Sequence, residues 1–178
     1  MRTGFLFLAV AVSLSMAPVA AQAPTRGAAP GPSAVAISDA SMLAGKWTYR
    51  SFHNNPAPVG DDPNKALNLI FAEAVFTFEI PSSTTLKGTI DWPGGGLDLQ
   101  GTIRANSGAT SPTVEIIGTG RPGTATQGWE YDYQGQLTPR WPSGVDQVPA
   151  IVGSVIRAKP HNGAPAGYVA SFIAVKRS

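Results

Sequence analysis

The stretch WEYDYQGQL, residues 129–137, alternates apolar or small side chains with polar ones along its whole length. Successive side chains of a β-strand point to opposite faces, so Trp129, Tyr131 and Tyr133 share one face while Glu130 and Asp132 share the other. One dry face and one wet face are typical of an antiparallel sheet. This stretch therefore predicts a strand that borders a hydrophobic interior.

The same period of two recurs along the chain between clusters of Gly, Pro, Asn and Ser. It predicts eight strands: Gly45–Phe52, Ala74–Ile80, Leu86–Trp92, Leu97–Arg104, Thr113–Gly118, Trp129–Leu137, Ile151–Ala158 and Tyr168–Lys176. The segment Asn64–Ala74 reads either as one or two turns of helix or as an extension of the second strand. Asp61-Asp62-Pro63 ahead of it offers an N-cap and a first-turn proline, which favours the helix.

Eight sequential strands with short connections predict an all-β domain, a single antiparallel up-and-down β-barrel, because closure removes exposed sheet edges. The alternative is a β-sandwich of two sheets. The seventh and eighth strands are apolar on both faces. We therefore expect their outer face to be covered, either by a second subunit in a homo-oligomer or by the helix before the second strand.

The N-terminal segment predicts export. Residues 1–23 combine a basic start, an apolar run and small residues suited to cleavage, and they read as a signal peptide. Residues 24–40 are rich in Pro, Ala and Gly and are expected to be a disordered leader, and residues 41–178 form the barrel domain. The expected location is periplasmic or secreted. No segment reaches the length of a membrane-spanning helix.

Composition narrows the classes of function. The chain has no cysteine, which excludes zinc-thiolate sites, iron–sulfur clusters and cysteine nucleophiles. Removal of Arg2 with the signal peptide leaves 12 basic and 11 acidic residues, scattered along the chain, so nucleic-acid binding is not expected. The turn WPGGG, residues 92–96, joins two strands and lacks the features of a phosphate loop. Ser51, Ser154 and Ser171 lack the sequence context of a serine hydrolase. No cofactor is predicted.

The sequence Leu43-Ala44-Gly45-Lys46-Trp47 at the start of the first strand resembles the Gly-x-Trp opening of lipocalins and the Leu-x-Gly-x-Trp opening of avidins. This resemblance to calycin-type barrels implies an eight-stranded cup for one small ligand. In lipocalins the Trp closes the barrel floor beneath an Arg near the end of the last strand, which implies that Arg177 stacks on Trp47. The ligand-binding residues of avidins have no match in this chain.

Strand direction sorts the connections onto two rims. The first rim gathers residues 53–72, 93–96, 118–128 and 159–167, and with them both histidines, His53 and His161. The second rim holds residues 138–149, where Trp141 is a candidate plug for the floor. His53 follows Tyr49 on the inward face, so it is a candidate catalytic base at the mouth of the cup if the protein is an enzyme. The alternative is that it merely caps a turn at Asn54-Asn55-Pro56.

The aromatic side chains that share the inward face predict a site for a small apolar or aromatic molecule. The predicted ligand-binding residues are Tyr49, His53, Phe78, Trp92, Trp129, Tyr131, Tyr133 and Phe172. A metal site built from both histidines with Asp61 or Asp62 is the weaker alternative, and no metal is predicted.

Three classes of function follow. The first is an exported carrier of a small ligand. The second is a cofactor-free isomerase, cyclase or lyase that uses His53 or a tyrosine for proton transfer, with the barrel architecture of dirigent proteins and allene oxide cyclases as an analogy. The third is a structural module with a filled core.

Overall fold

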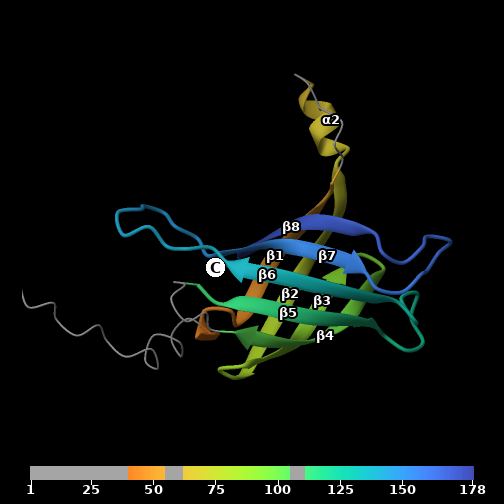
Figure 1. The fold of residues 1–178 in the computed structure, drawn as a ribbon, viewed down its shortest axis with the longest axis horizontal. Helices are drawn as coiled ribbons and strands as arrows, with labels where there is room; N and C mark the ends of the chain where they lie inside the picture. Colours follow the sequence, from red (N-terminus) through yellow and green to blue (C-terminus); the bar gives the residue numbers. More distant parts are fainter. Residues whose placement is uncertain (1–39, 55–61, 105–110) are drawn as a thin grey trace, which may run out of the picture. The chain divides into compact units, whose positions relative to one another are not determined.

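The computed structural model describes residues 40–54, 62–104 and 111–178, which contain eight strands and one labelled helix (Figure 1). The predicted signal peptide and nearly all of the predicted leader lie outside these residues. The elements are β1 (Gly45–His53), α2 (Pro63–Leu67), β2 (Ile70–Ser82), β3 (Thr85–Trp92), β4 (Gly95–Arg104), β5 (Thr113–Gly120), β6 (Glu130–Leu137), β7 (Ala150–Arg157) and β8 (Val169–Lys176). The described helix is not long enough to cross a membrane.

The strands form a closed barrel in sequence order, and every neighbouring pair is antiparallel. β8 returns to β1 with a register that runs from Trp47 opposite Lys176 to His53 opposite Ala170. This closure confirms the predicted up-and-down barrel and excludes the sandwich. An eight-stranded closed antiparallel barrel is compatible with a calycin-like shape.

Strand limits agree with the predicted ones to within two residues, except at the start of the second strand. There the two sequence-based alternatives each hold in part. A short helix forms at Pro63–Leu67, where a carboxylate oxygen of Asp62 accepts a hydrogen bond from the backbone N–H of Asn64 (2.9 Å). β2 then begins at Ile70, ahead of the expected residue, because the backbone there pairs with the far end of β1.

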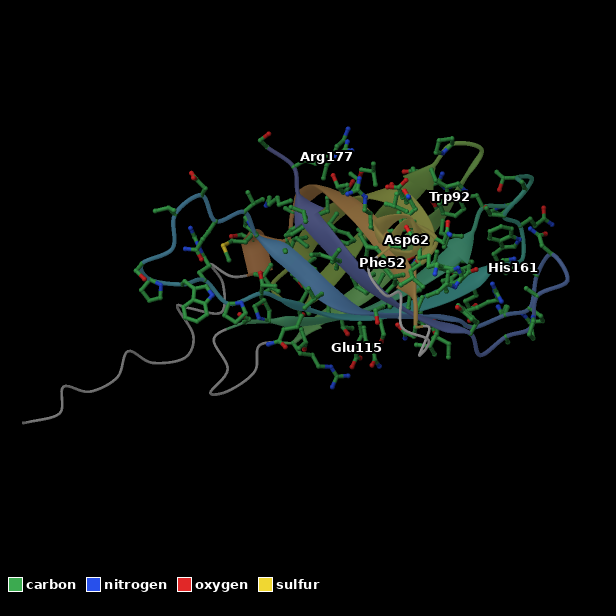
Figure 2. The ribbon with its side chains drawn as sticks, turned by 90° about the horizontal axis from the view of Figure 1, so that it is seen from above. Phe52, Asp62, Trp92, Glu115, His161 and Arg177 are labelled. Atoms are coloured by element: carbon green, nitrogen blue, oxygen red, sulfur yellow. The ribbon has the colours of Figure 1, made fainter. Side chains whose placement is uncertain are left out.

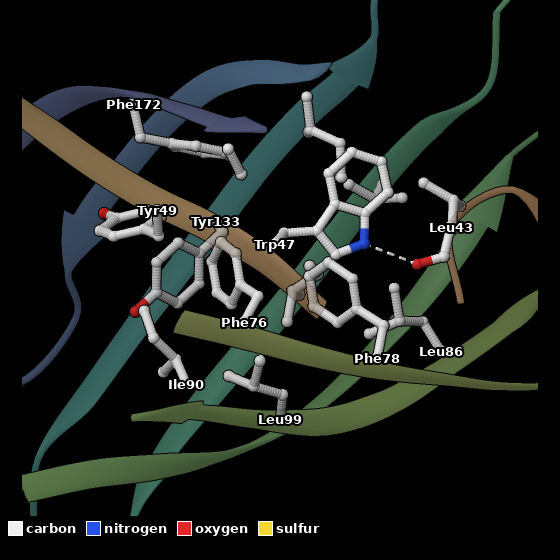
Figure 3. Close-up of a cluster of buried hydrophobic side chains, with 14 of the residues drawn as sticks. Leu43, Trp47, Tyr49, Phe76, Phe78, Leu86, Ile90, Leu99, Tyr133 and Phe172 are labelled. Carbon is white, nitrogen blue, oxygen red and sulfur yellow. Dashed lines mark hydrogen bonds between the residues drawn. The ribbon is translucent and has the colours of Figure 1, made fainter. Parts of the chain in front are cut away.

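Trp47 and Leu43 close one end of the barrel, which we call the floor. Both residues are fully buried, and the indole N–H of Trp47 donates to the carbonyl oxygen of Leu43 (2.8 Å; Figure 3). The ammonium nitrogen of Lys176 lies 5.4 Å from the Trp47 ring centroid and bonds the carbonyl oxygen of Met42. Burial lowers the pKa of Lys176.

The expectation that Arg177 stacks on Trp47 is wrong. Trp47 pairs with Lys176 across the β1–β8 seam, so Lys176 shares its inward face and the next residue points outward. Arg177 instead donates from Nε to the hydroxyl of Thr48 (3.0 Å). Trp141 does not plug the floor either, because it is 75% exposed.

Above the floor the interior is packed with aromatic and aliphatic side chains (Figure 3). Phe76 stacks on Phe78 with centroids 4.9 Å apart, and the rings of Phe76 and Tyr49 form a T-shaped pair with centroids 4.8 Å apart. Tyr49 also contacts Phe172 at 5.4 Å. These contacts make a continuous core through the middle of the barrel, which supports the wall of the cavity described below.

The outer face of β7 and β8 stays open to solvent in the single chain. Val152, Ile156 and Val169 are 43%, 37% and 41% exposed, so no described element, α2 included, covers them. Cover by a second copy remains a prediction.

Candidate functional site

A cavity of about 400 Å³ lies at the end of the barrel opposite the floor, which we call the mouth. Its wall is formed by strand ends from around the barrel, by the segment between β5 and β6 and by the segment between β7 and β8. The lining residues are Tyr49, Phe71, Ala72, Glu73, Ala74, Ile90, Trp92, Leu97, Trp129, Tyr131, Tyr133, Val155, Arg157 and His161. Figure 2 shows Trp92 and His161 at this end and Arg177 toward the other.

Five of the eight residues predicted from sequence meet at this cavity: Tyr49, Trp92, Trp129, Tyr131 and Tyr133. Phe78 and Phe172 do not line it, because both are buried in the packed core beneath. His53 lies at the mouth but outside the lining.

One wall of the cavity is a stack of three rings. The His161 imidazole lies 3.8 Å from the Trp129 ring with an interplanar angle of 13°, and Trp92 lies 6.3 Å from Trp129 at 21°. Gly95, which pairs with Trp92 across the β3–β4 turn, makes room for this stack. A Cβ there would lie 2.7 Å from the Trp92 indole nitrogen. The stack is therefore built by the turn as well as by the rings.

The segment between β5 and β6 holds Trp129 through hydrogen bonds to the β3–β4 hairpin. Arg121 donates from Nε to Asp98 (2.7 Å) and from Nη1 to Asp91 (2.8 Å). The hydroxyl of Thr126 donates to the carbonyl oxygen of Gly96 (2.7 Å), and the carbonyl of Thr126 accepts from the N–H of Trp129 (2.9 Å). Burial alone would raise the pKa of Asp91, but hydrogen bonds from Thr89 and Arg121 lower it. These contacts fix one indole relative to the other.

A second wall of the cavity carries its polar groups. The hydroxyl of Tyr131 lies 2.9 Å from Nε2 of His161 and 3.3 Å from Nε of Arg157. Burial and the nearby Arg157 charge lower the pKa of His161, so its imidazole is neutral at neutral pH. Nδ1 of His161 is buried and has no hydrogen-bond partner among the described residues.

His53 belongs to an outer layer of the mouth. Its Nδ1 is hydrogen-bonded to the hydroxyl of Tyr168, and its ring meets the Phe71 ring edge-on at 5.2 Å. The Arg157 guanidinium lies 5.6 Å from the Tyr168 ring centroid. The neighbouring Asn54 accepts a hydrogen bond from Ser171 (2.7 Å), and the rest of the expected turn lies outside the described residues.

The two deep phenols of the cavity are held in their neutral form. Burial raises the pKa of Tyr49 and of Tyr133 well above the ordinary value. A neutral phenol donates a hydrogen bond and does not act as a base near neutral pH. These groups are therefore suited to binding a ligand.

Sequence reasoning missed Arg157 as a site residue and considered His161 only as a metal ligand. Arg157 continues the inward series Ile151, Gly153 and Val155 of β7, so strict alternation already indicates its direction. In the described ranges, no group of three or more His, Asp or Glu side chains could hold a metal ion. Asp61 lies outside them.

Comparison with models of known protein families and with curated proteins finds no match for this chain.

Proposed function

We propose that this protein is an exported carrier that binds one flat apolar or aromatic molecule in the mouth cavity, in the manner that its likeness to lipocalins and avidins implies. The observation that carries the proposal is the formed cavity of about 400 Å³ with the Trp92–Trp129–His161 stack as one wall. Its volume lies within the roughly 300–1,000 Å³ typical of small-molecule sites. Flat rings offer a large contact area to a flat ligand.

Binding of the neutral fluorescent probe N-phenyl-naphthylamine tests the proposal. The wild type should bind the probe with increased fluorescence, and Trp129→Ala should weaken the affinity roughly tenfold or more, because a wall of the cavity is lost. Trp141→Ala is the matched control, since this tryptophan is exposed on the connection between β6 and β7. Equal affinity of the two variants, or no binding by the wild type, would overturn the proposal.

A second candidate function is a cofactor-free isomerase, cyclase or lyase. The observation that favours it is the Tyr131 hydroxyl in the cavity wall, in contact with both His161 and Arg157. In this candidate function the Tyr131 hydroxyl holds or moves a proton of the bound molecule, because Tyr131 lines the cavity whereas His53 does not. Native mass spectrometry of protein purified from its own host separates the two functions: a carrier returns one bound species unchanged on incubation, whereas an enzyme converts it.

A further inference from the structure

The charged groups at the mouth cavity do not cancel. Two of its lining residues, Glu73 and Arg157, carry full charges. Glu73 lies on the outer face of β2, opposite Arg50, and accepts a hydrogen bond from the Arg50 Nε (2.7 Å). Arg157 forms no ion pair with any carboxylate in the described part of the chain, although Arg50, Arg104 and Arg121 all do. The cavity is therefore left with one uncompensated positive charge.

Neutral groups hold Arg157 in place without neutralising it. Its Nε donates to the Tyr131 hydroxyl and its Nη1 donates to the carbonyl oxygen of Pro165 (3.0 Å). The ring of Tyr168 packs against the guanidinium. Nη2 makes no hydrogen bond to a described residue. A partly buried guanidinium fixed in this way, with free N–H groups, is suited to a planar carboxylate.

The apolar and cationic parts of the cavity meet at His161. Its ring stacks on Trp129, while its Nε2 contacts the Tyr131 hydroxyl that Arg157 also contacts. Because a buried acceptor without a partner is tolerated better than a buried N–H without one, the unpartnered Nδ1 favours the tautomer with the proton on Nε2. Nε2–H then donates to Tyr131, and the Tyr131 hydroxyl hydrogen is left for a ligand beside Arg157.

We propose that the cavity selects a flat aromatic carboxylic acid, with its rings on the Trp92–Trp129–His161 stack and its carboxylate bound by Arg157 and the Tyr131 hydroxyl. This inference rests on the proposed binding function and names the chemical class of its ligand. A monoanion matches the single uncompensated charge.

Isothermal titration calorimetry with naphthalene carboxylate and its neutral amide, naphthalene carboxamide, tests the inference, because the two probes share shape and differ in charge. The wild type should bind the carboxylate roughly 10- to 100-fold more tightly than the amide, the range expected of a hydrogen-bonded ion pair. Raising the ionic strength should weaken binding of the carboxylate and leave binding of the amide unchanged.

The Arg157→Gln variant should bind both probes with the weaker affinity of the amide, and Arg157→Lys should restore part of the preference. Arg140→Gln is the matched control, since Arg140 is exposed on the loop between β6 and β7. N-phenyl-naphthylamine binding reports whether each variant keeps a formed cavity.

Each outcome bears on one claim. If the wild type binds N-phenyl-naphthylamine but does not prefer the carboxylate, the inference is overturned and the proposed function stands. A preference that survives in Arg157→Gln also overturns it. If the wild type does not bind N-phenyl-naphthylamine, the proposed function fails, and the inference that rests on it fails as well.

Discussion

The floor and the mouth of the barrel both depend on tryptophan but use it in opposite ways. At the floor, Trp47 is fully buried and its indole N–H is satisfied by Leu43. At the mouth, Trp92 and Trp129 stack with each other, and no described residue accepts a hydrogen bond from either indole N–H. A fully buried ring with a satisfied N–H contributes to stability, whereas half-buried rings that line a cavity remain accessible to a small molecule. Under the proposed function, the residues that stabilise the fold and those that bind the ligand are thus separated along the barrel axis.

Removal of the floor tryptophan should have the largest effect. Trp47→Ala should lower the free energy of unfolding by about 3–5 kcal/mol, because it leaves a cavity beneath Lys176 in a packed core. Urea unfolding measures the change. Trp129→Ala should lower the free energy of unfolding much less. Equal losses in the two variants would contradict the division between a stabilising floor and an accessible mouth.

Crowding the mouth should have an intermediate effect. Gly95→Ala places a methyl group against the Trp92 indole and should cost about 1–3 kcal/mol of stability. It should also weaken probe binding, because the ring must leave the stack. A double-mutant cycle provides the control: in a Trp92→Ala background the same substitution should cost little. A full cost in that background would show that Gly95 serves the turn alone.

The pH dependence of stability that His161 causes at the mouth should be the smallest of the three effects. The pKa of His161 is lowered from its ordinary 6.5 by burial and by Arg157. As the pH falls below about 6.5 the unfolded chain therefore takes up a proton before the folded one does, and the free energy of unfolding falls until the pH passes the lowered pKa. In unfolding experiments from neutral to mildly acidic pH, His161→Gln should show a shallower decline than the wild type. If the free energy of unfolding depends on pH in the same way in both proteins, protonation of His161 does not cause the decline.

The barrel was readable from the sequence because alternation fixes which face each side chain takes. Alternation does not fix height along the barrel axis, which depends on the stagger between strands. For this reason Phe78 and Phe172 were correctly placed inside, yet they belong to the core beneath the cavity. For the same reason Arg177 was expected over Trp47, whereas the neighbouring Lys176 lies there. Only the register between β1 and β8 shows that Lys176 faces inward.

The polar groups of the site were harder to predict because their partners are distant in sequence. His53 is hydrogen-bonded to Tyr168, 115 residues away in the sequence, and no local sequence pattern indicates that contact. Arg157 lies within the predicted seventh strand, but its partner Tyr131 is 26 residues away in the sequence and no local pattern indicates that contact. His161 lies in the connection that follows, outside any alternating stretch.

The Arg121 contacts to Asp91 and Asp98 have a thermodynamic consequence. The Arg121 guanidinium connects the segment that carries Trp129 to the hairpin that carries Trp92. The spacing of these two indoles is therefore fixed before a ligand binds. Little conformational entropy is then lost on association, and a larger share of the contact energy remains as affinity. We therefore expect the ligand-free and ligand-bound forms of the protein to superimpose closely at the mouth of the barrel.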